Sequence, residues 1–132
     1  MSKKNNNKKK KTTTPVKISN YFLMSQGDID IKDINDAVKD EYETEIWPDS
    51  GIMEVLIAEN GSMDFEEIEA EFEDDFSNDF LLKHNIQKVF YVTFKSEFES
   101  SAKYIMELIC NSNLGFFCCD SPDFTPIIKK ED

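Results

Sequence analysis

Residues 88–120 constrain the fold most, because this stretch holds three apolar segments with two different periodicities. Residues 88–96 (KVFYVTFKS) would place β-branched and aromatic side chains on both faces of a strand, which is typical of a strand buried between two layers. Residues 98–109 carry apolar side chains at helical intervals, and residues 114–120 (LGFFCCD) form a second short apolar run. A strand, a helix and a strand in this order predict a βαβ unit, whose two strands run parallel in one sheet.

The first half of the chain repeats this order of elements. Residues 16–25 are too apolar for a solvent-facing edge and predict a central strand. A helix is predicted to start with Asp30 as its N-cap and Asp33 in its first turn, and to end near residue 43. The turn residues of Trp47-Pro48-Asp49-Ser50-Gly51 follow, and residues 52–59 (IMEVLIAE) predict another strand.

The dipeptide Asn60-Gly61 favours a tight turn between antiparallel strands, so a partner strand is predicted from residue 62 to about residue 72. The same stretch also fits a helix, since Phe65, Ile68 and Phe72 recur at helical intervals. We favour the hairpin, because a turn that follows a buried strand needs a second strand to pair with. The acidic solvent side of this strand would then form a protected edge of the sheet. A short helix is predicted over residues 77–84.

Taken together, these elements predict an α+β domain of the ferredoxin-like sandwich type over residues 16–132. It would have two βαβ-like halves, a mixed sheet of four to five strands, two main helices on one face and an extra short helix. Residues 1–15 hold six lysines, several asparagines and no acidic residue. They contain too little apolar surface to offset the entropy of ordering, so we expect a disordered tail.

The charge of the chain limits its partners. The whole chain has 27 acidic residues and 15 lysines, it contains no arginine, and residues 16–132 alone carry a formal charge of −18. Such a body is a poor binder of nucleic acid or anionic membranes. No apolar run approaches the length of a membrane span. The three cysteines, two of them adjacent, are typical of reduced thiols in a cytoplasmic protein.

No residue pattern indicates catalysis, a cofactor or a metal. His84, the single histidine, fits the end of a predicted helix. Cys118 and Cys119 lack the Cys-x-x-Cys spacing and have no adjacent basic residue to lower a thiol pKa, so we expect a packing role. The aspartates that begin at Asp28 do not match a calcium loop, because its glycine and glutamate positions hold Asp33 and Lys39. We therefore do not expect an enzyme, although a thiol enzyme that uses Cys118 or Cys119 stays open.

The acidic run after residue 65 is the most unusual feature, and it leads to a functional hypothesis. Trp47 fits either a buried position at the sheet edge or an exposed interface anchor. In the second case, Trp47 and the acidic run would dock the protein onto a basic protein partner, as an immunity or inhibitor protein does when it neutralises a nuclease toxin. A ligand-sensing regulatory module of ferredoxin-like type, acting as a dimer, is the alternative. The expected partner-binding residues are Trp47, Glu66, Glu67, Glu69, Glu71, Glu73, Asp74 and Asp75.

Overall fold

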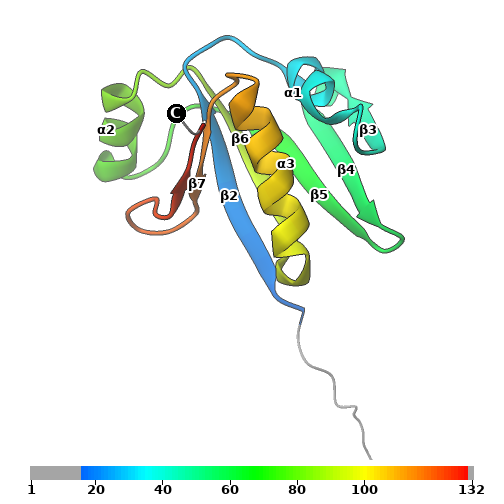
Figure 1. Cartoon of the computed structure of the whole chain (residues 1–132). Coiled ribbons are helices and arrows are strands. Elements are labelled where there is room, and N and C mark those ends of the chain that lie inside the picture. The colour runs from blue at the N-terminus through cyan, green and yellow to red at the C-terminus, as the bar shows by residue number, and fades with distance from the viewer. Residues whose placement is uncertain (1–15, 131–132) are drawn as a thin grey trace, which may run out of the picture.

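A computed structural model describes residues 16–130 of the chain. The predicted disordered tail, residues 1–15, lies outside the described residues. The described part contains strands and three α-helices around one sheet (Figure 1). Their order is β2 (Ile18–Ser25), α1 (Ile31–Val38), β3 (Thr44–Trp47), β4 (Ile52–Ala58), β5 (Gly61–Ile68), α2 (Asp75–Lys83), β6 (Lys88–Lys95), α3 (Glu99–Asn111), β7 (Phe116–Cys119) and β8 (Ile127–Ile128). Single turns of 3₁₀ helix, Pro48–Ser50 and Ser96–Phe98, precede β4 and α3.

The sheet has seven strands in the order β3-β4-β5-β6-β2-β7-β8, and every neighbouring pair is antiparallel. Strand β2 lies between β6 and β7, so the start of the domain pairs with two strands from its second half. This confirms the prediction that residues 16–25 form an interior strand. The register pairs Ile18 with Lys95 and Phe22 with both Tyr91 and Cys118.

Helices α1 and α3 cover one face of the sheet (Figure 1). Their apolar stripes, including Ile34 of α1 and Ile105 of α3, are fully buried against inward-facing strand residues such as Phe65 and Phe90. The opposite face carries a second, smaller core under α2 and the segment that leads to β8. Aromatic rings dominate it, with Phe124 in contact with Phe22 at a ring-centroid distance of 6.0 Å.

Two local predictions are confirmed. Asp30 is the N-cap of α1, and a capping box joins it to Asp33: each side chain accepts a hydrogen bond from the other residue's backbone N–H. Strands β4 and β5 form the predicted antiparallel hairpin, so residues 61–68 are a strand and not a helix. Its two turn residues are Glu59 and Asn60, one position earlier than the predicted Asn60-Gly61, because Gly61 pairs with Ala58 as the first residue of β5.

The ferredoxin-like prediction is wrong, because the sheet is a single seven-stranded, all-antiparallel sheet and not a mixed sheet of four to five strands. Strands β6 and β7 do run in the same direction, but β2 lies between them and forms antiparallel ladders with both. The periodicity of residues 88–120 identified the two strands and the helix correctly. It carried no information on which strand would lie between them.

The predicted boundaries also need correction around β3. Helix α1 ends at Val38 and not near residue 43, and Thr44–Trp47 forms the edge strand β3. Thr44 and Ile46 alternate with Glu45 and Trp47, and this short alternation is sufficient for a strand because β4 offers a partner. The predicted acidic edge is wrong as well, because β5 lies inside the sheet between β4 and β6, and it ends at Ile68.

Candidate functional site

One part of the sheet has no layer over it on the side opposite α1 and α3. On β4 and β5 the residues Met53, Val55, Met63 and Phe65 are buried in the larger core, so the alternating residues point to the other face. There the smaller core under α2 covers the β6, β2 and β7 end of the sheet; it reaches Ile68 at the end of β5 and is bordered by Tyr91. We call the remaining surface the open face; its residues are Glu45, Trp47, Ile52, Glu54, Asp64, Glu66, Tyr91 and Thr93.

The register arranges the open face in two cross-strand rows. In the first row Glu45 lies opposite Glu54, and Glu54 lies opposite Asp64. Thr93 continues this row on β6. Cross-strand neighbours on one face have Cβ atoms roughly 5 Å apart, so like charges in direct opposition destabilise the sheet. Three carboxylates in one such row are therefore a local cost to stability.

The second row of the open face combines aromatic, apolar and acidic groups. Trp47 lies opposite Ile52, Ile52 opposite Glu66, and Glu66 opposite Tyr91. The Trp47 side chain is 45% exposed although it is the largest side-chain type. Residues of both rows, from Ile52 to Thr93, line a shallow hollow of about 380 Å³. The open face therefore offers a concave, acidic surface with an indole at one corner.

Positive charge lies at the margin of the open face. Lys95 is on the same side of β6, two residues beyond Thr93, and its Nζ donates to the backbone oxygen of Asn60 at 3.1 Å. At the other margin the Tyr91 hydroxyl donates to Oδ2 of Asp120 at 3.2 Å. The two carboxylate rows themselves contain no lysine.

The structure brings together only two of the predicted partner-binding residues, Trp47 and Glu66, which flank Ile52 on the open face. Glu67 lies on the opposite face, where its Oε2 is 2.9 Å from Nζ of Lys88. This hydrogen bond is the main reason that the pKa of Lys88 is raised. Glu67 is thus part of an ion pair within the chain.

The other predicted acidic residues belong to the connection between β5 and α2. Glu69, Glu71 and Glu73 are exposed there and belong to no strand. Asp74 is the N-cap of α2 and accepts hydrogen bonds from the backbone and side chain of Ser77, which lower its pKa. Asp75 begins the helix, where a negative charge suits the positive end of the helix dipole.

Sequence reasoning did not assemble Glu45, Glu54 and Asp64 into a site. The signal was the alternation of Met53, Glu54 and Val55 and of Met63, Asp64 and Phe65, which places each carboxylate opposite the core face. That signal shows which way each side chain points. It does not show that the carboxylates align across three strands, because this depends on the register.

The thiols are placed for packing. Cys110 lies in the larger core and Cys118 in the smaller one, and burial raises their pKa values to about 11 and about 12. A nucleophilic thiol needs the opposite shift. Among residues 16–130, no three potential metal ligands lie close enough together to hold an ion. No helix in this part of the chain is long and apolar enough to cross a membrane.

Comparison of this chain with protein-family models, curated proteins and solved structures finds no match. The functional argument therefore rests on the geometry and charge of the open face.

Proposed function

We propose that the protein is a non-catalytic cytoplasmic binding protein whose open face docks onto a basic surface of a protein partner. The observation that supports this most directly is the alignment of Glu45, Glu54 and Asp64 across three strands of a face that no other element covers. Opposed like charges destabilise the free protein. Positively charged groups of a partner would attract these carboxylates and offset the repulsion among them.

Trp47 supplies the second element that a stable interface needs. Charged groups mainly steer encounter and orient a complex, whereas buried aromatic side chains supply much of the binding free energy. Trp47 is close to half exposed, and its neighbours in the row are Ile52 and Glu66. A partner that covers this corner removes the indole from water while its cations meet the adjacent carboxylates.

The concrete form of the proposal is an immunity or inhibitor protein that neutralises a nuclease toxin. A nuclease binds the phosphates of its substrate through a basic cleft. A rigid sheet face whose carboxylates lie one strand spacing apart, roughly 5 Å, presents a dense line of negative charge to such a cleft. The formal charge of −18 over residues 16–132 would also accelerate association at low ionic strength.

The first experiment compares two triple variants of equal net charge. One neutralises the open face through Glu54→Gln, Asp64→Asn and Glu66→Gln; the control neutralises exposed acids elsewhere through Asp40→Asn, Glu97→Gln and Glu107→Gln. Partners are captured from the source cell at low salt, released at high salt, identified and purified. Association rates are then measured between 50 and 300 mM NaCl.

The open-face variant should associate at least about 10-fold more slowly at 50 mM NaCl and should depend less on salt, whereas the control should remain close to wild type. Equal rates for the two triple variants would refute the assignment of the face. In the same assay Trp47→Ala should raise the dissociation rate at least about 10-fold, since hot-spot truncations cost 2 kcal/mol or more.

The inhibitor function has its own readout. One equivalent of the protein should abolish nuclease activity of the purified partner, and the open-face variant should fail to do so at the same concentration. A basic partner that binds through the open face but cleaves no nucleic acid would leave the docking proposal intact and eliminate the nuclease-inhibitor form of it. The alternative hypothesis, a dimeric regulatory module, assumed a ferredoxin-like sheet. The described residues form a seven-stranded antiparallel sheet instead, so we do not propose this alternative.

A further inference from the structure

The carboxylates of the open face have no positively charged partner within residues 16–130. The ion pairs in this part of the chain use other acids, namely Asp28, Asp36, Glu67 and Glu99. Asp64 accepts a hydrogen bond from the uncharged hydroxyl of Ser62 at 2.8 Å. The negative charge of Glu45, Glu54, Asp64 and Glu66 is therefore not balanced by any cation of the described residues.

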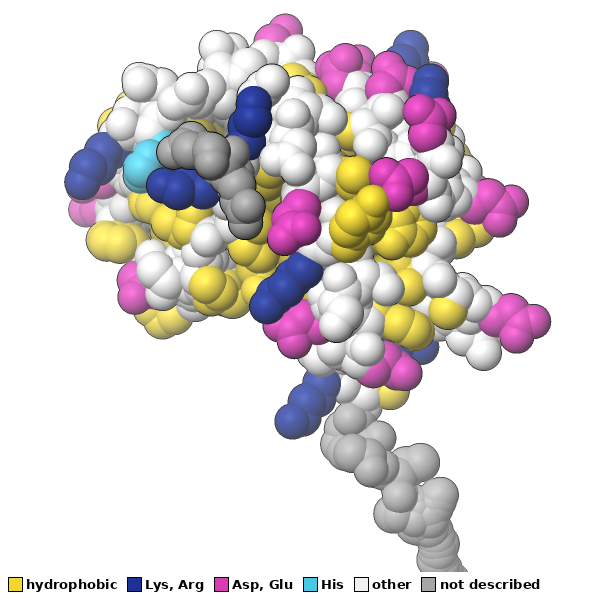
Figure 2. All heavy atoms as spheres, in the orientation of Figure 1, with side chains coloured by type: hydrophobic (Ala, Val, Ile, Leu, Met, Phe, Trp, Pro, Cys, Tyr) yellow, Lys and Arg dark blue, Asp and Glu magenta, His cyan; other side chains and the backbone are white. Residues whose placement is uncertain are grey.

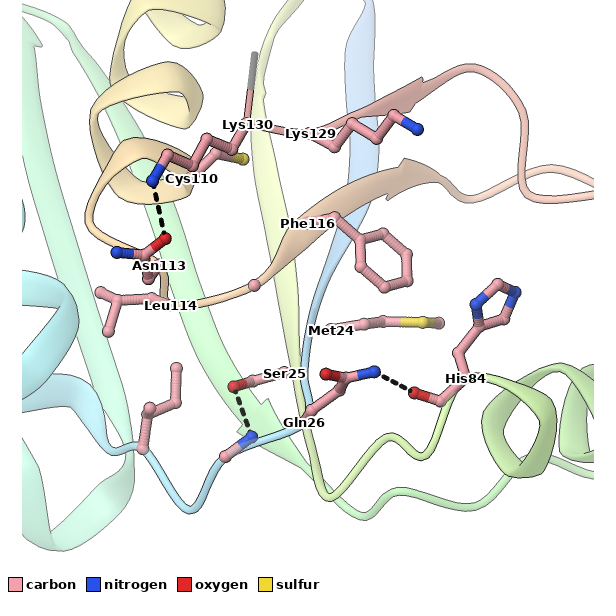
Figure 3. A pocket seen from close by; sticks show the side chains of 13 residues that line it. Met24, Ser25, Gln26, His84, Cys110, Asn113, Leu114, Phe116, Lys129 and Lys130 are labelled. Carbon is pink, nitrogen blue, oxygen red and sulfur yellow. Dashed lines mark hydrogen bonds between the residues drawn. The ribbon is translucent and has the colours of Figure 1, made fainter. Parts of the chain in front are cut away.

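The lysines of the described residues lie elsewhere. On the side of α1 and α3, which faces the viewer in Figure 2, lysine and acidic side chains are interspersed. Lys39 and Lys103 form ion pairs there within their own helical segments. Lys129 and Lys130 follow β8 at the far edge of the sheet, where Nζ of Lys130 donates to Oδ1 of Asn113 at 3.0 Å (Figure 3).

The charge that the open face lacks is concentrated in residues 1–15. Six of the fifteen lysines of the chain belong to this segment, four of them in the unbroken run 8–11, and the segment contains no acidic residue. Its lysines carry a formal charge of +6, against four carboxylates on the open face. The two parts of the chain are thus complementary in charge.

The described chain begins on the side of the sheet that carries the open face. Phe22 and Met24 of β2 belong to the smaller core on that side, so Ile18 points the same way by strand alternation, and it is 52% exposed. Asn20 lies opposite Thr93, the residue that continues the first carboxylate row on β6. Strand β2 therefore starts two residues from the end of that row.

The segment is long enough to lie along the row. Glu54 is three strands away from Ile18 and two residues further along, a distance of about 16 Å, and Glu45 is one strand further, at about 20 Å. An extended chain covers roughly 3.3 Å per residue, so Lys11 can lie up to about 23 Å from Ile18 and Lys8 up to about 33 Å. Both reach the carboxylates with residues to spare for the turn back over the sheet.

Covalent attachment makes weak contacts sufficient. Single ion pairs at a protein surface are weak and are screened by salt. A tethered segment, however, meets its site at an effective concentration in the millimolar range, so several such pairs can keep the site occupied. The contacts join ammonium groups to carboxylates and require no regular secondary structure.

We propose that residues 1–15 bind the open face of their own chain, with the lysines of the run 8–11 against Glu45, Glu54 and Asp64. In the free protein the segment covers the face, and a basic partner has to displace it. The displacement rests on the proposed function, because it needs a partner at the same face. The binding of the segment itself does not.

The first test maps the contact in the full chain. A carbodiimide, which joins a lysine amine directly to a carboxylate, is applied in 20 mM NaCl, and the linked peptides are identified by mass spectrometry. Links from residues 1–15 to the open face should be at least about 5-fold more frequent than links to the exposed Asp40 or Glu107, and should decrease in 500 mM NaCl.

Two outcomes of this mapping would overturn the proposal. The first is preferential linkage to Glu97 or Glu99, which lie close to the start of β2 because the Ser96 N–H donates to the Lys17 oxygen at 2.9 Å. The second is linkage between copies, which a mixture of ¹⁴N- and ¹⁵N-labelled chains reveals. It would place the segment on a neighbouring molecule instead.

The second test compares two variants of equal net charge, in each of which six lysines are replaced by glutamine. The tail variant changes Lys3, Lys4, Lys8, Lys9, Lys10 and Lys11. The control changes six exposed lysines of the body, Lys32, Lys39, Lys83, Lys103, Lys129 and Lys130. The probe is nonalysine, a peptide of nine lysines, and its binding in 20 mM NaCl is measured by isothermal titration calorimetry.

The tail variant should bind nonalysine at least about 3-fold more tightly than the control, because its open face is no longer covered. Equal or weaker binding by the tail variant would refute the coverage. The two proposals can fail separately. If the segment links to other acids, the open face stays available for a partner; if the cellular partner binds the open-face triple variant normally, the proposed function fails while the cross-links remain.

Discussion

Glu54 lies directly opposite Asp64 on neighbouring strands, on a face that no other element covers. Glu45 lies opposite Glu54 from the other side, so Glu54 has a carboxylate on both flanks. Sheets normally avoid this arrangement, because like charges in opposition oppose pairing. Here the arrangement coincides with an exposed tryptophan in the adjacent row. The dense negative charge of the open face therefore lowers the stability of the free protein.

Neutralising Glu54 should stabilise the free protein. Glu54→Gln keeps the size of the side chain and removes two unfavourable contacts, so its unfolding free energy should rise by roughly 0.4–1 kcal/mol at low salt. Urea denaturation at 20 mM and 1 M NaCl measures this, and the gain should shrink at high salt as the charges are screened. Glu97→Gln is the matched control on an exposed site outside the row. A gain no larger for Glu54→Gln than for Glu97→Gln would contradict the argument.

Gly115 should tolerate no side chain. Its φ is +152°, and an added Cβ would lie 2.2 Å from the backbone oxygen of Met24, an atom that cannot move without disrupting the β2–β7 ladder. Gly115→Ala should therefore lower the unfolding free energy by about 2–3 kcal/mol, a typical size for backbone strain. Gly27→Ala is the control, because its nearest contacts would be ordinary ones at 3.7 and 3.8 Å. Equal losses for both variants in thermal unfolding would show that the close approach is unimportant.

Gly61 makes a close approach of a different kind. A Cβ at this position would lie 2.3 Å from the ring of Phe98, which is the end of a side chain and can rotate. Gly61→Ala should cost about 1–2 kcal/mol, as overpacking does. The cost should fall by at least half in a Phe98→Leu background, because the shorter side chain leaves room. A double-mutant cycle by chemical denaturation measures this coupling; additive effects would mean that the ring is not the obstacle.

Stability should fall at alkaline pH through Cys118. Its folded pKa is raised to about 12 from an ordinary value of 9.0, so the unfolded chain loses this proton first as the pH rises. The folded state then loses about 1.4 kcal/mol per pH unit between pH 9 and 12, and nothing below pH 9. The Cys118→Ala variant lacks this dependence of the unfolding free energy on pH but retains the dependence that comes from Cys110. The stability gap between wild type and Cys118→Ala, measured in urea under reducing conditions, should therefore narrow from pH 9 to pH 10.

A constant gap across that range would mean that Cys118 ionises alike in both states. An independent check is thiol labelling at pH 8 in native buffer. The buried Cys110 and Cys118 should react far more slowly than free cysteine and should reach its rate only in denaturant.

Local chemistry made much of this fold predictable. The apolar run of residues 52–59 predicted one strand, Asn60-Gly61 predicted the hairpin to the next strand, and Asp30 with Asp33 predicted the start of α1. Each of these signals comes from residues close together in sequence. Strand β3 was missed because Thr44–Trp47 is short and directly precedes strong turn residues.

Long-range pairing was not predictable, and it decided both the fold class and the site. Nothing near Ile18 in the sequence indicates that it pairs with Lys95, so the position of β2 between β6 and β7 could not be derived. The open face depends on register in the same way. Trp47 and Glu66 were identified singly, but their common neighbour Ile52 is visible only once three strands are aligned.

The central position of β2 has a consequence for how the chain acquires its structure. This strand is synthesised well before both of its partners, β6 and β7. The β4–β5 hairpin can close at once, whereas the middle of the sheet must wait until β6 and β7 have been synthesised. Pairing across such long separations slows folding, because the loop has to close before the contacts form. Until Cys118 and its neighbours emerge, the apolar residues of β2 lack their strand partners, and an unpaired apolar strand is a site at which chains aggregate.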